Sequence, residues 1–136
     1  MINFIEISDT NTFIFEHGKC IEYNKREGII NVICKAHFID AKKYMQYARA
    51  KLGITQNVPI YLSSSLLLFR IKADNKEYHI NYFMIKYVEE MNGMIIIHFL
   101  DGSAVDIKTT QRKYEIIEKK INIILHYIDN LENEYF

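Results

Sequence analysis

The stretch NVPIYLSSSLLLFRIKADNKEYHINYFMIKYVEE, residues 57–90, contains the only proline of the chain, three consecutive serines, and then alternating aromatic and aliphatic residues. Serine and the Ala-Asp-Asn segment favour turns, whereas β-branched and aromatic residues favour strands. The stretch therefore predicts short strands at about 59–62, 66–72, 77–82 and 84–90. Such closely spaced strands are typical of an antiparallel meander.

The three serines, Ser63 to Ser65, raise the question of a catalytic nucleophile. A nucleophilic serine needs a base, an orienting acid and an oxyanion hole, and the strained elbow of hydrolases flanks it with glycines. No glycine lies near these serines in the sequence, so we interpret them as a polar turn. The sequence also lacks a P-loop, a dinucleotide-binding glycine pattern and a paired-carboxylate motif, so it predicts neither an enzyme nor a cofactor.

Outside this stretch, turn pairs such as Asn92-Gly93 and Asp101-Gly102 separate further short apolar runs. These runs predict strands at about 2–7, 12–16, 19–24, 29–35, 94–99 and 103–108.

Two helices interrupt the predicted strands. The first spans about 40–52, with Asp40 as its N-cap and Gly53 as its terminator. The second spans about 111–131, and its apolar stripe is Tyr114, Ile117, Ile121, Ile124, Ile128 and Leu131. We therefore expect one α+β domain, 1–136, with mostly antiparallel meander or barrel-like sheets, one short middle helix and a long C-terminal amphipathic helix.

The composition limits the possible partners. The 17 basic and 17 acidic residues balance, which argues against a strongly electrostatic partner unless the charges lie on separate faces. No apolar window is long enough to cross a membrane, and the first residues do not resemble a signal peptide. Two cysteines without an export signal indicate a reducing cytosol, so we expect a cytoplasmic protein with no membrane partner.

Both cysteines lie three residues from a histidine. If 19–24 and 29–35 paired as a hairpin, Cys20 would face Cys34, and His17 would face His37. Four such ligands suit zinc, but strand positions three apart point to opposite faces. The sequence therefore favours no metal, and these four residues are the alternative zinc candidates.

Basic side chains gather in the middle of the chain. No acidic residue lies between Lys42 and Lys51, whereas acidic residues are frequent late in the chain. A neutral DNA-binding protein needs such a charge separation, although an ordinary solvated helix face has the same pattern. The DNA-binding candidates are Lys42, Lys43, Arg49, Lys51, Arg70 and Lys72. Of these, Arg49 and Arg70 are expected to enter a narrow, AT-rich minor groove.

Four segments follow one another in a recognisable order. A basic, glycine-containing segment ends in proline-isoleucine (ARAKLGITQNVPIYL, 48–62), and a phenylalanine-centred strand follows (LLLFRI, 66–71). An aromatic-aliphatic strand comes next (YHINYFMIKYVEE, 78–90), then a strand-turn-strand (IIIHFLDGSAVDI, 95–107). This order resembles the competence transcription factor (ComK) family over about residues 3–125, although Tyr78-His79-Ile80 replaces that family's Cys-x-Trp-Ile.

The resemblance implies a cytoplasmic, sequence-specific DNA-binding activator that works as an oligomer on AT-rich duplex DNA. Two alternatives stay open. INYFMIKYVEEMNGMIIIHFLDG (80–102) also resembles the strand-turn-strand of LytTR-like DNA-binding domains. Antiparallel strands followed by a long C-terminal helix equally suit a pleckstrin-homology-like module that binds a peptide or ligand.

The second helix has a further apolar strip beside its main stripe. This strip is formed by Ile116, Ile123 and Tyr127, and Leu125 broadens it. One sheet face rarely covers so wide an apolar arc, and exposed apolar patches mark interfaces. We therefore predict a homodimer with Ile116, Ile123 and Tyr127 at or near its interface.

Overall fold

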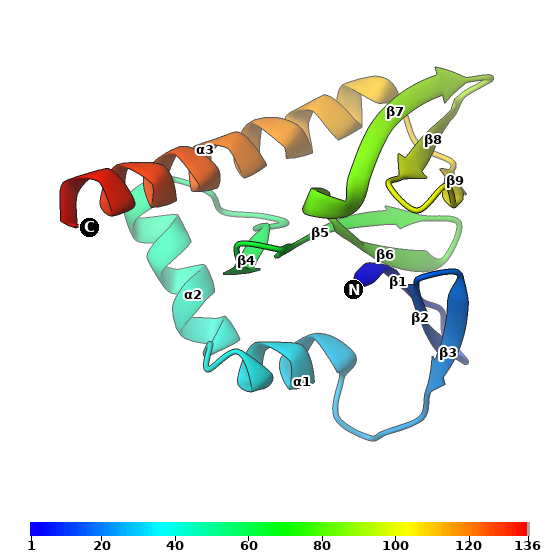
Figure 1. Ribbon diagram of the computed structural model, residues 1–136, viewed down its shortest axis with the longest axis horizontal. Coiled ribbons are helices and arrows are strands. Elements are labelled where there is room, and N and C mark those ends of the chain that lie inside the picture. Colours follow the sequence, from blue (N-terminus) through cyan, green and yellow to red (C-terminus); the bar gives the residue numbers. More distant parts are fainter. Residues whose placement is uncertain (136) are drawn as a thin grey trace.

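Nine strands form two antiparallel sheets in the computed structural model, which describes residues 1–135 (Figure 1). The strands are β1 Ile2–Ile7, β2 Thr12–Glu16, β3 Lys19–Tyr23, β4 Ile60–Ser63, β5 Leu66–Ala73, β6 Lys76–Asn81, β7 Ile85–Met91, β8 Met94–Phe99 and β9 Ala104–Ile107. The larger sheet has the strand order β3-β2-β1-β6-β5-β4, and the smaller sheet has the order β7-β8-β9.

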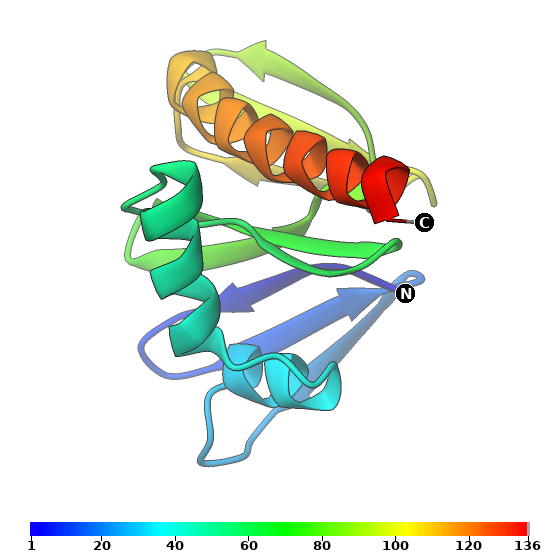
Figure 2. The same cartoon turned by 90° about the vertical axis from the view of Figure 1, so that its left-hand side faces the viewer.

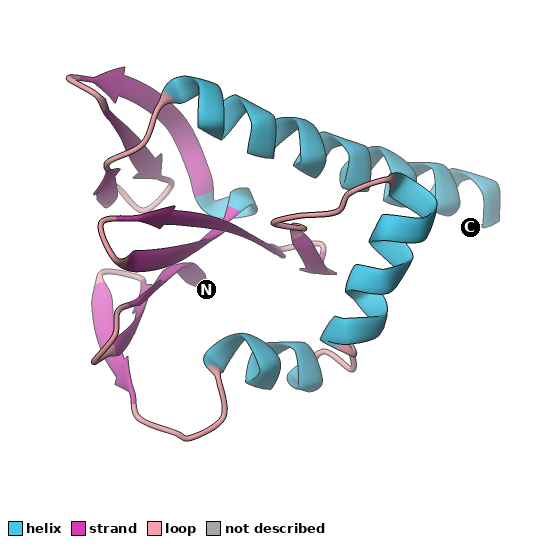
Figure 3. Cartoon of the chain, turned by 180° about the vertical axis from the view of Figure 1, so that it is seen from behind, coloured by secondary structure: helices cyan, strands magenta, loops and turns pink. Residues whose placement is uncertain are grey.

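Three α-helices lie beside these sheets and leave one side of the strands without a helix (Figure 3). They are α1 Ile29–Ala36, α2 Ala41–Tyr47 and α3 Gln111–Tyr135. A π-helical turn, Ala48–Leu52, continues α2, and a 3₁₀ turn, Tyr82–Met84, joins β6 to β7. The predicted α+β class, with antiparallel sheets, a short middle helix and a long C-terminal helix, is confirmed. Within residues 1–135, no helix is both long enough and apolar enough to cross a membrane.

The strand β5 separates two hydrophobic cores, because its successive side chains point to opposite faces. Leu67 and Phe69 pack into a core with β8 and α3, whereas Leu66 and Leu68 pack into a second core with α1. Both cores are built on the larger sheet, with one on each face. On the α1 side the apolar residues of β5 stop at Leu68, and the next residues on that face are charged. This leaves a polar surface beside the helices.

The long helix α3 buries part of its predicted stripe. Tyr114 and Ile121 are buried in the core shared with β8, and Ile117 packs against it. Ile124 is buried as well. The helix begins where the Thr110 hydroxyl accepts a hydrogen bond from the Lys113 N–H at 3.2 Å. It continues to Tyr135, four residues beyond the predicted end at 131.

The prediction of a strand at 29–35 is wrong, since these residues form α1. The run Ile29-Ile30-Asn31-Val32-Ile33 has high β propensity, yet Ile29 and Ile33 lie one helical turn apart and are both buried. Packing of that helical face against the sheet outweighs local propensity. The predicted hairpin is therefore absent, and β3 pairs instead with β2, where Cys20 lies opposite Phe15.

Candidate functional site

Helices α1 and α2 form a helix-turn-helix arrangement. Four residues, 37–40, separate them, and α2 runs up from the end of α1 instead of folding back along it (Figures 1 and 2). The Ile39 N–H bonds the Cys34 carbonyl at 2.8 Å and ends α1. The Asp40 carboxylate accepts a hydrogen bond from the Lys43 N–H at 3.0 Å and starts α2. Two helices joined by a short turn have the connectivity of the helix-turn-helix motif.

The inner side of α2 is fixed to the sheet by Tyr44. Its hydroxyl donates to the Pro59 carbonyl at 2.8 Å and accepts from the Tyr61 N–H at 3.0 Å. Burial raises the pKa of this hydroxyl, so it stays protonated and keeps donating. These bonds set the rotation of α2 about its axis, and therefore which of its residues face outward.

Four predicted DNA-binding residues lie exposed on α2 and the π-helical turn after it. This α2 basic face consists of Lys42, Lys43, Arg49 and Lys51. The four side chains do not form a single row. Lys43 borders a groove toward α3, whereas Arg49 borders a cavity toward the sheet. The structure therefore brings these residues onto one element and spreads them around its exposed side.

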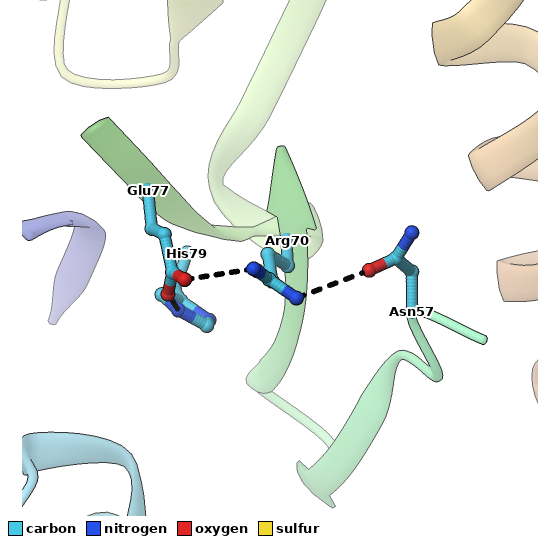
Figure 4. A network of polar contacts seen from close by, with 4 residues as sticks. All are labelled: Asn57, Arg70, Glu77 and His79. Carbon is cyan, nitrogen blue, oxygen red and sulfur yellow. Dashed lines mark hydrogen bonds and ion pairs between the residues drawn. The ribbon is translucent and has the colours of Figure 1, made fainter. Parts of the chain in front are cut away.

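The cavity beside Arg49 has a volume of about 480 Å³. Its floor is the polar surface of the sheet beside the helices, formed by Arg70, Glu77 and His79. Arg70 donates from Nη2 to Glu77 Oε1 at 2.7 Å and from Nη1 to Asn57 Oδ1 at 3.4 Å. The other Glu77 oxygen lies 3.3 Å from His79 Nε2 (Figure 4). Glu77 thus holds both Arg70 and His79, which face one another across β5 and β6.

Burial and charge act in opposite directions on this network. Burial lowers the pKa of His79, and the Glu77 carboxylate offsets only part of that effect. For Glu77, burial favours the neutral acid, but the hydrogen bond with His79 and the charge of Arg70 outweigh it and lower the pKa. Near neutral pH the network therefore contains an ionised Glu77, a charged Arg70 and a neutral His79.

A second cleft, of about 360 Å³, shares Arg70 and Asn57 with the cavity and lies at the edge of β5, beyond the residues that pair with β4, and beside α3. We call it the cationic cleft, and its basic residues are Arg70, Lys72, Lys113 and Lys120. No carboxylate of the described chain, residues 1–135, lines it. Lys113 and Lys120 were not predicted from the sequence. Their spacing of seven residues on one helix face was visible, but their position against β5 was not.

The four zinc candidates do not come together. His17 lies in the exposed turn between β2 and β3, Cys20 is exposed on β3, Cys34 is buried on α1, and His37 follows α1 in the turn. No group of three or more histidine, cysteine, aspartate or glutamate side chains within residues 1–135 could hold a metal ion. The ligand set fails because it depended on the hairpin that α1 replaces. Of the three serines predicted to form a turn, Ser63 is the last residue of β4, and Ser64 and Ser65 form the turn to β5.

The groove between α2 and α3 is mostly apolar. It is lined by Tyr127, one of the three residues predicted at the dimer interface. The Tyr127 hydroxyl is hydrogen-bonded to the Tyr47 hydroxyl, so Tyr127 packs within the chain. Ile116 and Ile123, by contrast, keep 49% and 43% of their surface exposed.

Comparison of the chain with known protein families, with curated proteins and with solved structures gave no match.

Proposed function

We propose that the protein is a cytoplasmic regulator that binds duplex DNA through α2. The observation that supports this most directly is the helix-turn-helix pair, whose second helix presents the α2 basic face. Helix-turn-helix proteins place such a second helix in the major groove and contact the phosphates on either side. The resemblance to competence transcription factors implies AT-rich target sites. The proposal keeps those sites but replaces the expected minor-groove insertion of Arg49 and Arg70 by major-groove contact from α2.

Charge on α2 favours contact with phosphate. After the capping residue Asp40, no acidic residue occurs on α2 or the following π-helical turn. Lys42 lies in the first turn of α2, and Gln46 follows on the same exposed side one turn later. Glutamine can form paired hydrogen bonds with adenine in the major groove. We therefore assign base contact to Gln46, and phosphate contact to the basic residues around it.

The fold holds α2 firmly enough for this role. Tyr44 anchors its inner side to the loop before β4 and to the start of β4, and Ala48 is buried beneath the helix. A side chain on a rigid element reaches a groove with less loss of conformational entropy than a side chain on a loop. Arg70 and Lys72, also predicted to contact DNA, lie on β5 in the cationic cleft and not on α2.

Fluorescence polarisation with labelled AT-rich and GC-rich duplexes over a range of salt concentrations tests the proposal. We expect the wild type to bind the AT-rich duplex more tightly, with log K falling linearly as log salt rises. The double substitution Lys42→Gln and Lys43→Gln should weaken binding to both duplexes and reduce the slope by about 2.

A matched control is the double substitution of Lys19→Gln and Lys86→Gln. These lysines are exposed on β3 and β7, away from α2. This control removes the same charge and should leave the slope unchanged. Absence of binding by the wild type at low salt, or equal losses in the two double variants, would contradict the proposal.

A further inference from the structure

We propose that the cationic cleft binds a small molecule that carries a diphosphate group. This site is distinct from the α2 basic face and goes beyond DNA binding. Its four basic side chains come from two elements that are far apart in the sequence. Arg70 and Lys72 belong to β5, and Lys113 and Lys120 belong to α3, whose first half lies above β5 and β6 in Figure 2.

The charge of the cleft indicates how many phosphate groups it suits. Four cationic side chains line it, and Glu77 in the adjoining cavity neutralises one of them, Arg70. Three positive charges then remain without a carboxylate among the lining residues of the described chain. One phosphate group carries about −1.5 to −2 charges at pH 7, so two such groups match the cleft better than one.

Part of the cleft is already organised to bind an anion. Glu77 and Asn57 fix the Arg70 guanidinium from two sides. Its Nε is buried and has no hydrogen-bond partner within residues 1–135. Lys120 donates from Nζ to the Gln56 carbonyl at 2.8 Å, which fixes its position beside the cleft. A ligand that accepts hydrogen bonds from these held donors loses little entropy on binding.

The remaining lining residues limit the size and chemistry of the ligand. Thr109 and Asn57 can donate hydrogen bonds, whereas Ile71, Ile116 and Ile117 provide an apolar wall. The volume of about 360 Å³ suits a diphosphate with a small organic group, and a cleft lined by one sign of charge concentrates anions. A small diphosphate balances the positive charge of the cleft, so a nucleic-acid chain is not required.

Isothermal titration calorimetry with inorganic pyrophosphate as the probe tests the inference. We expect one binding site per chain, and no comparable binding of sulfate at matched ionic strength. Lys113→Gln and Lys120→Gln should each weaken pyrophosphate binding by about tenfold or more, because each removes a charge-assisted hydrogen bond.

Lys119→Gln is the matched control. Lys119 is the exposed neighbour of Lys120 on α3 but does not line the cleft, so its removal should leave pyrophosphate affinity unchanged. Failure of the wild type to bind pyrophosphate, or equal losses in the Lys119 and Lys120 variants, would overturn the inference. Thermal unfolding without ligand checks folding, and Lys113→Gln should unfold no earlier than the wild type because it relieves like-charge repulsion.

DNA binding is measured on the same variants to separate the two proposals. Pyrophosphate binding that survives the double substitution at Lys42 and Lys43 supports an independent cleft. If Lys113→Gln and Lys120→Gln weaken DNA binding while pyrophosphate does not bind, the cleft contacts the DNA backbone. That result would overturn the small-ligand inference and leave the DNA proposal standing.

Discussion

At the scale of single residues, Asn81 connects three parts of the larger sheet. Its fully buried side chain accepts from the N–H groups of Leu67 and Phe83, both at 3.2 Å. It also donates to the carbonyls of Ile2 and Ser65, both at 3.0 Å. One side-chain amide therefore provides hydrogen-bond partners for backbone groups at the ends of β1, β5 and β6.

Replacing Asn81 by alanine should lower the free energy of unfolding by about 3–4 kcal/mol, because four buried or partly buried backbone groups lose their partner. Urea denaturation measures the change. The control is Asn122→Ala on the exposed side of α3, which should alter stability by about 0.5 kcal/mol or less. Similar effects of the two substitutions would show that the network around Asn81 is not needed for stability.

His79 makes stability depend on pH. Its side chain is only 13% exposed, and burial lowers its pKa, so below about pH 6.5 the unfolded chain binds a proton that the native protein resists. The stabilising effect is complete above this pH and is lost as pH falls. Between about pH 7.5 and 5.5, the free energy of unfolding should therefore drop more for the wild type than for His79→Gln.

Denaturant titrations at a series of pH values measure this difference. Glu77 has a lowered pKa and so remains ionised over this range, which leaves the comparison to His79. The substitution His126→Gln, at an exposed position of α3, controls for loss of an imidazole. If His79→Gln and the wild type showed the same pH dependence, the burial argument would be wrong.

At the scale of elements, the strands were largely predictable and α1 was not. Turn pairs such as Asn92-Gly93 mark strand ends directly, and β8 lies where it was predicted, at 94–99. The residues of α1 have the composition of a strand, and only the four-residue spacing of Ile29 and Ile33 indicates a helix. Because residues 29–35 were predicted as a strand, the helix-turn-helix arrangement of α1 and α2 could not be anticipated.

The turn after α1 contains a strained residue. Phe38 is 99% exposed and has a φ of +58°, at the position where helices often end with glycine. Phe38→Gly should therefore raise the free energy of unfolding by about 1 kcal/mol, as measured by urea denaturation. Phe38→Ala removes the same ring but keeps a Cβ, so it should give no such gain. A loss of stability in both variants would mean that the ring contributes packing.

At the scale of the whole molecule, the candidate site depends on contacts between distant segments. The α2 residues were predictable because they lie close together on a predicted helix, with no acidic residue between Lys42 and Lys51. Lys113 and Lys120 were missed, because only the packing of α3 over β5 brings them to Arg70. A single sequence contains no local pattern for such packing.

The homodimer is the prediction that belongs to this scale. Tyr127 packs against Tyr47, so the exposed strip on α3 consists of Ile116 and Ile123. Apolar side chains exposed on one helix are covered most simply by the same strip of a second copy. Light scattering at micromolar concentration should therefore give twice the chain mass of 16.2 kDa.

Ile123→Glu should reduce that mass to 16.2 kDa while circular dichroism stays unchanged. The adjacent exposed substitution Asn122→Glu adds the same charge outside the strip and should leave the dimer intact. A wild type that is already 16.2 kDa would contradict the prediction.

The position of β5 between two cores limits how the length of this chain can vary. Inserting or deleting one residue within Leu66–Ala73 would turn its side chains to the opposite faces and disturb both cores at once. The hairpin tips at Asp74-Asn75 and Asn92-Gly93 are exposed and belong to neither core. Insertions accepted during evolution, or peptide tags added by an experimenter, should therefore be tolerated at these tips and rejected within β5.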